Sequence, residues 1–254
     1  MNEQLEINNV SLILTTLLLV IAILVAYKEK LGLGNDILIA GVRAFIQLFI
    51  IGYVLKYIIE VNNFFLTLLM VLFIVFNAGY NAHKRSEGIP NTLFISLFSI
   101  SLGTAVTLTI LVLTGAIDWT PTQIVPISGM VASNAMVAIG LTFRTLNSKF
   151  TDLRQQVLEK LALGANEKQA SMTIIRESVK TGMSPSIDST KTVGLVSLPG
   201  MMSGLIIAGV DPIEAIRYQI VVMFMIISVT SIASFTASYM AYRQFFNERK
   251  QLIL

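Results

Sequence analysis

The sequence contains no cysteine and a single histidine, His83. These two absences exclude disulfide bonds, thiolate metal sites, thiol nucleophiles and metal sites built from several histidines. The chain is also poor in charge, because Asp, Glu, Lys and Arg together make up 13% of its 254 residues. A soluble domain needs more charged side chains than this to cover its surface. The scarcity of charge therefore indicates a chain that lies largely in lipid.

Long apolar runs take the place of the missing charge. Hydrophobic residues make up 54% of the chain, and its mean hydropathy is +0.75. Seven runs approach the length of about 20 residues that a helix needs to cross a bilayer. They cover residues 10–27, 37–59, 64–79, 93–117, 124–143, 192–209 and 218–242. The expected fold is all-α: a polytopic membrane protein with about seven transmembrane helices, in which residues 1–254 form a single transmembrane domain.

Lysine and arginine alternate along the chain in a way that predicts its orientation. The odd-numbered expected loops and the C-terminal tail together hold 15 of these residues, whereas the N-terminal tail and the even-numbered loops hold one. Loops rich in Lys and Arg stay on the cytoplasmic side of a membrane. Seven crossings with the N-terminus outside and the C-terminus inside fit this distribution.

One expected cytoplasmic loop, residues 144–191, is much longer than the others. Leucine and valine recur at helical spacing over 153–161 with charged residues between them, which predicts an amphipathic helix. Gly164 suits a helix stop. Asn166, followed three residues later by Gln169, is typical of a helix N-cap with a capping box. The loop is therefore expected to be two helices joined at a glycine.

The second of these helices is expected to run to about Lys180, because Gly182 and Pro185 follow it. Two interpretations of the helix pair stay open at this point. A basic amphipathic pair can lie on the anionic inner leaflet, or it can dock a cytoplasmic partner protein.

Polar and sulfur-bearing side chains inside the apolar runs are the candidates for a substrate pathway, since polar groups are costly in lipid. Thioethers are soft ligands and amide or backbone oxygens are hard ones, so a mixed lining suits a weak, transient cation site. Ordinary packing by methionine and snorkelling of Arg43 to the headgroups are the alternatives. The candidates are Met130, Asn134, Met136, Pro199, Met201, Met202, Arg43 and Gln47; the metal is unknown, and no catalytic residue is expected.

Several short motifs, in order along the chain, resemble the FetB (YbbM-type) family of ABC-transporter permeases. The resemblance covers residues 40–220, most of the chain. The motifs are VRAFIQL (42–48), GM (129–130), NAM (134–136), LGA (163–165), VGLVSLPGMM (193–202) and DPxxAxRYQ (211–219).

The resemblance implies a permease of the cell (inner or plasma) membrane that works with a cytoplasmic ABC ATP-binding subunit, as a homodimer. Bacterial members of this family are associated with iron export and plant relatives with aluminium tolerance. The loop at 144–191 is similar to the coupling-helix loop of such permeases, in which a short helix enters a cleft on the ATPase. A bulky side chain at the central glycine is expected to block the turn. The implied docking residues are Glu159, Leu163, Gly164, Ala165 and Gln169.

The sequence lacks the G-x-x-x-x-G-K-[ST] loop that cradles ATP phosphates, so ATP is expected on the partner subunit and no cofactor on this chain. We therefore expect a non-enzymatic subunit that exports a metal cation, with no nucleic-acid partner. The alternative is a gradient-driven secondary transporter or channel for a small cation. That alternative would require ionisable residues at mid-membrane for coupling, and Arg43 and Lys56 are the only charged residues inside the runs.

Overall fold

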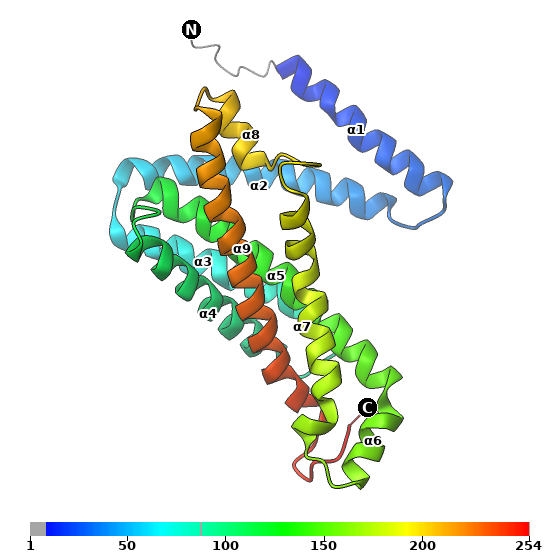
Figure 1. Ribbon diagram of the computed structural model, residues 1–254. Helices are drawn as coiled ribbons and strands as arrows, with labels where there is room; N and C mark the ends of the chain where they lie inside the picture. Colours follow the sequence, from blue (N-terminus) through cyan, green and yellow to red (C-terminus); the bar gives the residue numbers. More distant parts are fainter. Residues whose placement is uncertain (1–8, 87, 254) are drawn as a thin grey trace. The chain divides into compact units, whose positions relative to one another are not determined.

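The computed structural model describes residues 9–86 and 88–253, and over these residues the chain is helical throughout (Figure 1). Nine α-helices and one short 3-10 helix follow one another within this described part. Contacts divide the chain into two compact units, residues 1–62 and 63–254.

The first unit is a hairpin of two apolar helices, α1 (Asn9–Lys28) and α2 (Gly34–Val61). The turn between them passes through Gly32, whose φ of +71° lies in the left-handed region that glycine adopts without a steric cost. The helices approach closely where the Leu19 side chain lies over Gly41, since a Cβ on that glycine would lie 2.8 Å from a Leu19 methyl carbon. No residue of the most apolar part of α2 is buried within the protein. Such a surface is expected of helices that face lipid or another protein subunit.

The second unit is a bundle organised around two long helices, α5 (Pro121–Asp152) and α9 (Pro212–Ala241). Helix α5 packs against α3, α7 and α9, and α9 packs against α4, α5 and α7. Figure 1 shows α5, α7 and α9 side by side along this unit. The remaining elements are α3 (Phe64–Lys84), α4 (Thr92–Leu113), α6 (Arg154–Ala162), α7 (Glu167–Thr192), α8 (Gly200–Ile207) and the 3-10 helix η1 (Tyr242–Phe245).

Local side-chain chemistry explains where several of these helices begin. The Asn63 side chain accepts hydrogen bonds from the backbone N–H groups of Phe65 and Leu66, which caps α3. The Asp211 carboxylate accepts from the N–H of Ile213 at 2.9 Å, and Pro212 occupies the first position of α9, where its missing N–H costs nothing. Asp211 therefore caps α9.

Five helices of the described chain are long and apolar enough to cross a membrane: α2, α3, α4, α5 and α9 with η1. The stretch Leu14–Lys28 of α1 is a further apolar helix, shorter than these five. The chain is therefore a multi-pass membrane protein.

The run at 192–209 does not form one continuous helix. Helix α7 ends at Thr192, an irregular segment follows, and α8 has only eight residues. Gly194 has a φ of +80°, and Pro199 lacks the N–H that a helix interior requires. These two residues interrupt the apolar run.

The second helix of the long loop also differs from expectation, because it does not end near Lys180. Helix α7 continues through Gly182 and Pro185 to Thr192. Gly182 is buried where α7 packs against α5 and α9. Tertiary contact on this face outweighs the local preference of glycine and proline to end a helix.

Candidate functional site

A cavity of about 300 Å³ lies between α5, α7, α9 and the segment that joins α7 to α8. All of these elements belong to the second unit. Within the described residues, no three His, Asp or Glu side chains gather in a group that could hold a metal ion. The cavity is lined by Asn134, Val137 and Ala138 of α5, Gly182, Pro185, Ser186 and Ser189 of α7, Ser197 and Pro199 of the joining segment, and Met223 and Ile226 of α9.

Helical periodicity explains which residues of α7 line the cavity. Gly182, Pro185, Ser186 and Ser189 are spaced three and four residues apart, which places them on one face of the helix. Pro185 has no N–H, so the carbonyl of Thr181 lacks its usual helical donor. This face therefore presents hydroxyl groups next to a backbone carbonyl that has lost its helical partner.

The closest approach of three helices in the second unit occurs at Gly182. A Cβ there would collide with the Thr142 hydroxyl of α5 and lie 2.5 Å from the Ser234 hydroxyl of α9 and 2.9 Å from the Ala138 carbonyl oxygen. The Thr142 hydroxyl itself donates to Ala138 at 2.8 Å, so it is held against its own helix. Only glycine lets α7 approach this closely, and the approach sets the inner wall of the cavity.

The joining segment between α7 and α8 closes the cavity from a further side. The Gly194 N–H donates to the Ser197 carbonyl at 2.9 Å, which makes a tight turn. The apolar side chains at the tip of this turn, Leu195 and Val196, are 89% and 81% exposed. Broken helices of this kind line binding sites in many membrane transporters, because their irregular backbone leaves polar groups available inside the bilayer.

The structure separates the predicted pathway residues of the second unit into two groups. Asn134 and Pro199 line the cavity, and the Asn134 amide donates to the Met130 carbonyl of its own helix at 2.8 Å. The four methionines lie outside the lining: Met130, Met136 and Met201 are partly buried against the core, and Met202 is buried. A role for any of these residues in transport stays a prediction.

Sequence reasoning missed several lining residues. Met223 and Ile226 lie in the middle of an apolar run, and no local feature marks the face of α9 that turns toward α5 and α7. Ser186 and Ser189 lie in a stretch that was expected to be cytoplasmic loop. Their spacing from Gly182 was the one signal that could have found them, because it repeats with the helical period.

Arg43 and Gln47 lie in the first unit, on α2. They line a shallow groove together with neighbouring apolar side chains of the same helix. Their expected place in the pathway stays a prediction.

The α6–α7 turn has the geometry that its sequence predicts. Gly164 has a φ of +93°, its N–H donates to the Leu161 carbonyl, and the Ala165 N–H donates to the Lys160 carbonyl, each at 3.0 Å. These two bonds form a Schellman motif, which ends α6. Next to it, the Leu163 side chain is 88% exposed. The turn thus presents an apolar side chain to its surroundings on a well-defined backbone.

The capping box at the start of α7 is confirmed. The Asn166 side chain accepts from the Gln169 N–H at 2.9 Å, and the Gln169 side chain accepts from the Asn166 N–H at 3.0 Å. Both residues are exposed. The box holds the helix entry rigidly against the glycine turn.

We expect Asn166→Ala to lower the free energy of unfolding by about 1 kcal/mol, because it removes one capping bond from an N–H that has no helical partner. Thermal unfolding of the purified protein in lipid nanodiscs measures this effect. Asn166→Ser, which retains a capping oxygen, is the matched control and should stay close to the unsubstituted protein. Equal losses for the two substitutions would contradict a role for the cap.

The region around the turn is braced by contacts between distant parts of the second unit. The Phe150 ring of α5 stacks on Phe245 of η1 with centroids 4.1 Å apart. Lys149 pairs with Glu177 of α7 at 3.0 Å, and Lys250 approaches Glu167 at 3.8 Å. The C-terminal segment therefore helps to hold the helix pair in place.

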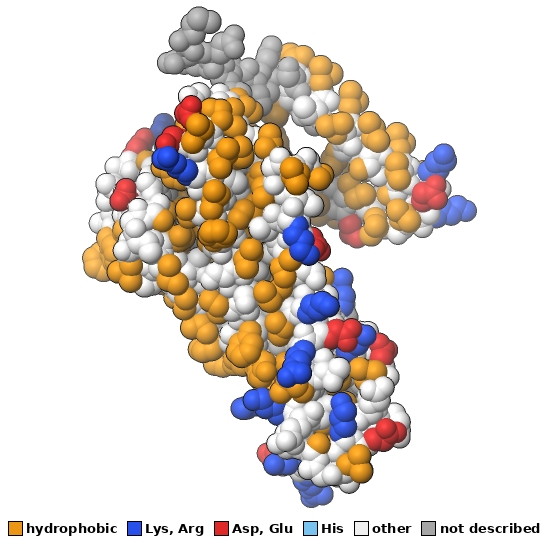
Figure 2. All heavy atoms as spheres, viewed as in Figure 1, with side chains coloured by type: hydrophobic (Ala, Val, Ile, Leu, Met, Phe, Trp, Pro, Cys, Tyr) orange, Lys and Arg blue, Asp and Glu red, His pale blue; other side chains and the backbone are white. Residues whose placement is uncertain are grey.

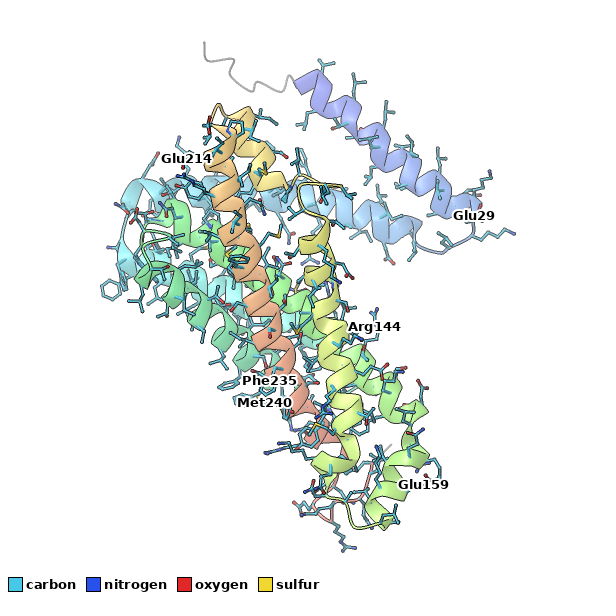
Figure 3. The ribbon with its side chains drawn as sticks, in the orientation of Figure 1. Glu29, Arg144, Glu159, Glu214, Phe235 and Met240 are labelled. Atoms are coloured by element: carbon cyan, nitrogen blue, oxygen red, sulfur yellow. The ribbon has the colours of Figure 1, made fainter. Side chains whose placement is uncertain are left out.

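Charge and hydrophobicity separate along the second unit. Figure 2 shows Lys and Arg gathered around α6 and along the adjoining part of α7, whereas hydrophobic side chains cover much of α9 farther from this end. In Figure 3, Glu159 projects from α6 at one end of this unit, and Glu214 lies near the start of α9 at the other. The basic end therefore coincides with the end that carries the α6–α7 turn.

Comparison with known proteins adds relatives that match nearly the whole chain. The sequence is 53% identical over 249 residues to the "Probable iron export permease protein FetB" of Escherichia coli, covering 98% of this chain and 96% of that one. It is 37% identical over 232 residues to "Protein ALUMINUM SENSITIVE 3" of Arabidopsis thaliana, covering 91% of this chain and 85% of that one. It is 36% identical over 242 residues to the "UPF0014 membrane protein YjkA" of Bacillus subtilis, covering 95% and 97%.

No solved structure matches the chain significantly. The family model of UPF0014, described as an uncharacterised protein family, matches residues 9–246, which include both helices of the first unit and the whole bundle of the second. The chain therefore belongs to the UPF0014 family.

Proposed function

We propose that this chain is the membrane-spanning permease subunit of an ABC transporter that exports a metal cation, with iron as the first candidate. The observation that carries the proposal is the 53% identity, over nearly the full length of both chains, to a relative named a probable iron export permease. The cavity between α5, α7 and α9 would hold the cargo, and the α6–α7 turn would dock the ATPase.

The docking role is supported by the form of the turn. A coupling element must transmit movement, so it needs a rigid backbone and a side chain that can enter a partner's cleft. The Schellman motif and the capping box supply the first, and the exposed Leu163 supplies the second. In the proposed assembly, two copies of this chain form a homodimer that binds two ATPases. The two cavities would lie near the centre of this dimer.

The proposed orientation places the N-terminus outside and the C-terminus inside, with seven crossings. The broken segment formed by the end of α7 and α8 counts as one of them. The basic end of the second unit would then face the cytoplasm, as the positive-inside rule requires. A reporter that is active only in the cytoplasm should therefore be active when it is fused after residue 254. Activity of a periplasm-specific reporter at that position would contradict this orientation.

Transport in inside-out membrane vesicles tests the function itself. Export from the cell corresponds to uptake into such vesicles, so vesicles that contain this chain and its co-purifying nucleotide-binding protein should take up Fe²⁺ only when ATP is supplied. An ionophore that collapses ion gradients should leave the uptake intact.

A gradient-driven secondary transporter is the second candidate, and the break between α7 and α8 favours it, because discontinuous helices beside a cavity are common in that class. Uptake that continues without ATP and stops with the ionophore would support this candidate over the first. Isolation of the tagged chain with no nucleotide-binding protein bound would point the same way.

A further inference from the structure

The cavity is much larger than a bare metal ion. Its volume is about 300 Å³, whereas six water molecules occupy about 180 Å³ at the density of the liquid. A divalent cation surrounded by six waters therefore fits, and the remaining space leaves room for it to enter and leave.

The chemistry of the lining also suits a hydrated ion better than a stripped one. The described residues that line the cavity are all uncharged, and the sulfur of Met223 is the only soft ligand among them. Removing water from a small divalent cation is costly, and such ions keep much of their hydration shell unless anionic ligands replace it. Neutral hydroxyl and amide oxygens do not supply that replacement.

A hydrated cation offers only hydrogen-bond donors, because its water molecules turn their oxygens to the metal. The lining supplies acceptors to match. The Asn134 amide nitrogen is already engaged with the Met130 carbonyl at 2.8 Å, which leaves its carbonyl oxygen for a ligand. The hydroxyl oxygens of Ser186, Ser189 and Ser197 accept hydrogen bonds as well.

We propose that the cavity binds its cation with the first shell of six waters intact, so that the protein recognises the aqua complex through hydrogen bonds and not through direct metal ligation. This inference rests on the proposed function, since it concerns the cargo of the same site. This outer-sphere mode differs from the direct ligation by thioethers and by amide or backbone oxygens that the sequence suggested. Weak outer-sphere binding also suits transport, because the ion is released without rebuilding its hydration shell.

The probe that tests this inference is hexaamminecobalt(III). Its six ammonia ligands do not exchange, and they present N–H donors in the octahedral arrangement of a hexahydrated ion. The complex is diamagnetic, whereas Fe²⁺ is paramagnetic. The chain is labelled with ¹³C at its methionine methyl groups and placed in lipid nanodiscs without oxygen. Met223 lines the cavity and reports on its occupancy; Met172, ten residues or about 15 Å before Gly182 along α7, is the reference.

We expect Fe²⁺ to broaden the Met223 methyl signal more than that of Met172, and hexaamminecobalt(III) to restore it by competition. Asn134→Leu should weaken the apparent affinity for the cobalt complex about fivefold, the effect of one lost hydrogen bond. The matched control is Asn77→Leu in α3, because the Asn77 amide donates to the Phe73 carbonyl of its own helix at 3.0 Å and Asn77 does not line the cavity. This control should retain the affinity of the unsubstituted chain.

Three results would overturn the inference. If Fe²⁺ broadens Met223 but the cobalt complex cannot displace it, the ion enters without its water, and the proposed export function stands while the hydrated mode falls. If neither Fe²⁺ nor the cobalt complex changes the Met223 methyl signal, the cavity admits neither a bare nor a hydrated cation. Equal effects of Asn134→Leu and Asn77→Leu would likewise exclude the proposed contact. Vesicle uptake of Fe²⁺ reports on export separately from all three results.

Discussion

Replacement of Gly182 by valine is expected to prevent stable packing of α7 against α5 and α9. Even the first carbon of a side chain at this position would meet the hydroxyls of Thr142 and Ser234 and the backbone carbonyl of Ala138. The Thr142 hydroxyl is held by its hydrogen bond to the Ala138 carbonyl, and that carbonyl belongs to a buried part of α5 and cannot move without displacing the helix. Overpacking of a close-packed core costs about 1–3 kcal/mol for a small addition, and we expect valine to reach or exceed the upper end of that range.

The measurement is the yield of monodisperse protein from membranes together with its midpoint of thermal unfolding. Gly182→Ala should give an intermediate loss, because it adds only the Cβ. The control is Gly129→Ala in α5, where a Cβ would have no neighbour within 4 Å. Since alanine favours a helix over glycine by about 1 kcal/mol, this control should be neutral or slightly stabilising. A Gly182→Val protein as stable as the Gly129→Ala control would show that α7 does not pack as described.

Replacement of Gly164 by tryptophan is expected to reduce co-purification of the proposed ATPase subunit at least tenfold while leaving the protein in the membrane. The expected obstacle was a bulky side chain filling the turn, but a Cβ at Gly164 has no neighbour within 4 Å. The obstacle is the backbone itself. Its φ of +93° is a conformation that side chains with a Cβ rarely adopt, at a cost of about 1–3 kcal/mol. Relief of that strain would unwind the Schellman turn and move Leu163.

Gly164→Asn separates backbone strain from the size of the side chain, because asparagine is the residue that best tolerates left-handed positions after glycine. It should retain more of the ATPase than Gly164→Ala, although its side chain is larger. The reverse order would indicate that contact area at the turn, and not its conformation, decides docking. Full retention by the tryptophan variant, with normal transport, would exclude the turn from the interface.

Local features of the helix termini could be predicted from the sequence because they depend on neighbours within a few residues. The N-cap at Asn166, its partner Gln169 and the glycine stop at Gly164 all have the predicted roles. Each requires only hydrogen bonds that close within a single turn of chain. The approximate positions of the long apolar helices followed for a similar reason, since run length alone matches the thickness of a bilayer.

The candidate site could be predicted only in part. Asn134 and Pro199 were found because a polar residue and a proline are conspicuous in apolar runs. Met223 lines the cavity but was not predicted, whereas Met201 was predicted and packs against the core. The local sequence around a methionine does not indicate which way its side chain faces. The lining depends on which helix faces meet, and that depends on packing between residues far apart in the chain.

By itself, the sequence determined the helical class of this protein, its residence in a membrane and the caps of its helices, because run length, charge and short-range hydrogen bonding decide these properties locally. The tertiary structure alone decided that α7 passes through Gly182 and Pro185 and that α5, α7 and α9 meet around a cavity. The physical reason is the close approach at Gly182. A residue that weakens a helix in isolation becomes the only one that fits once α5 and α9 are in contact with it.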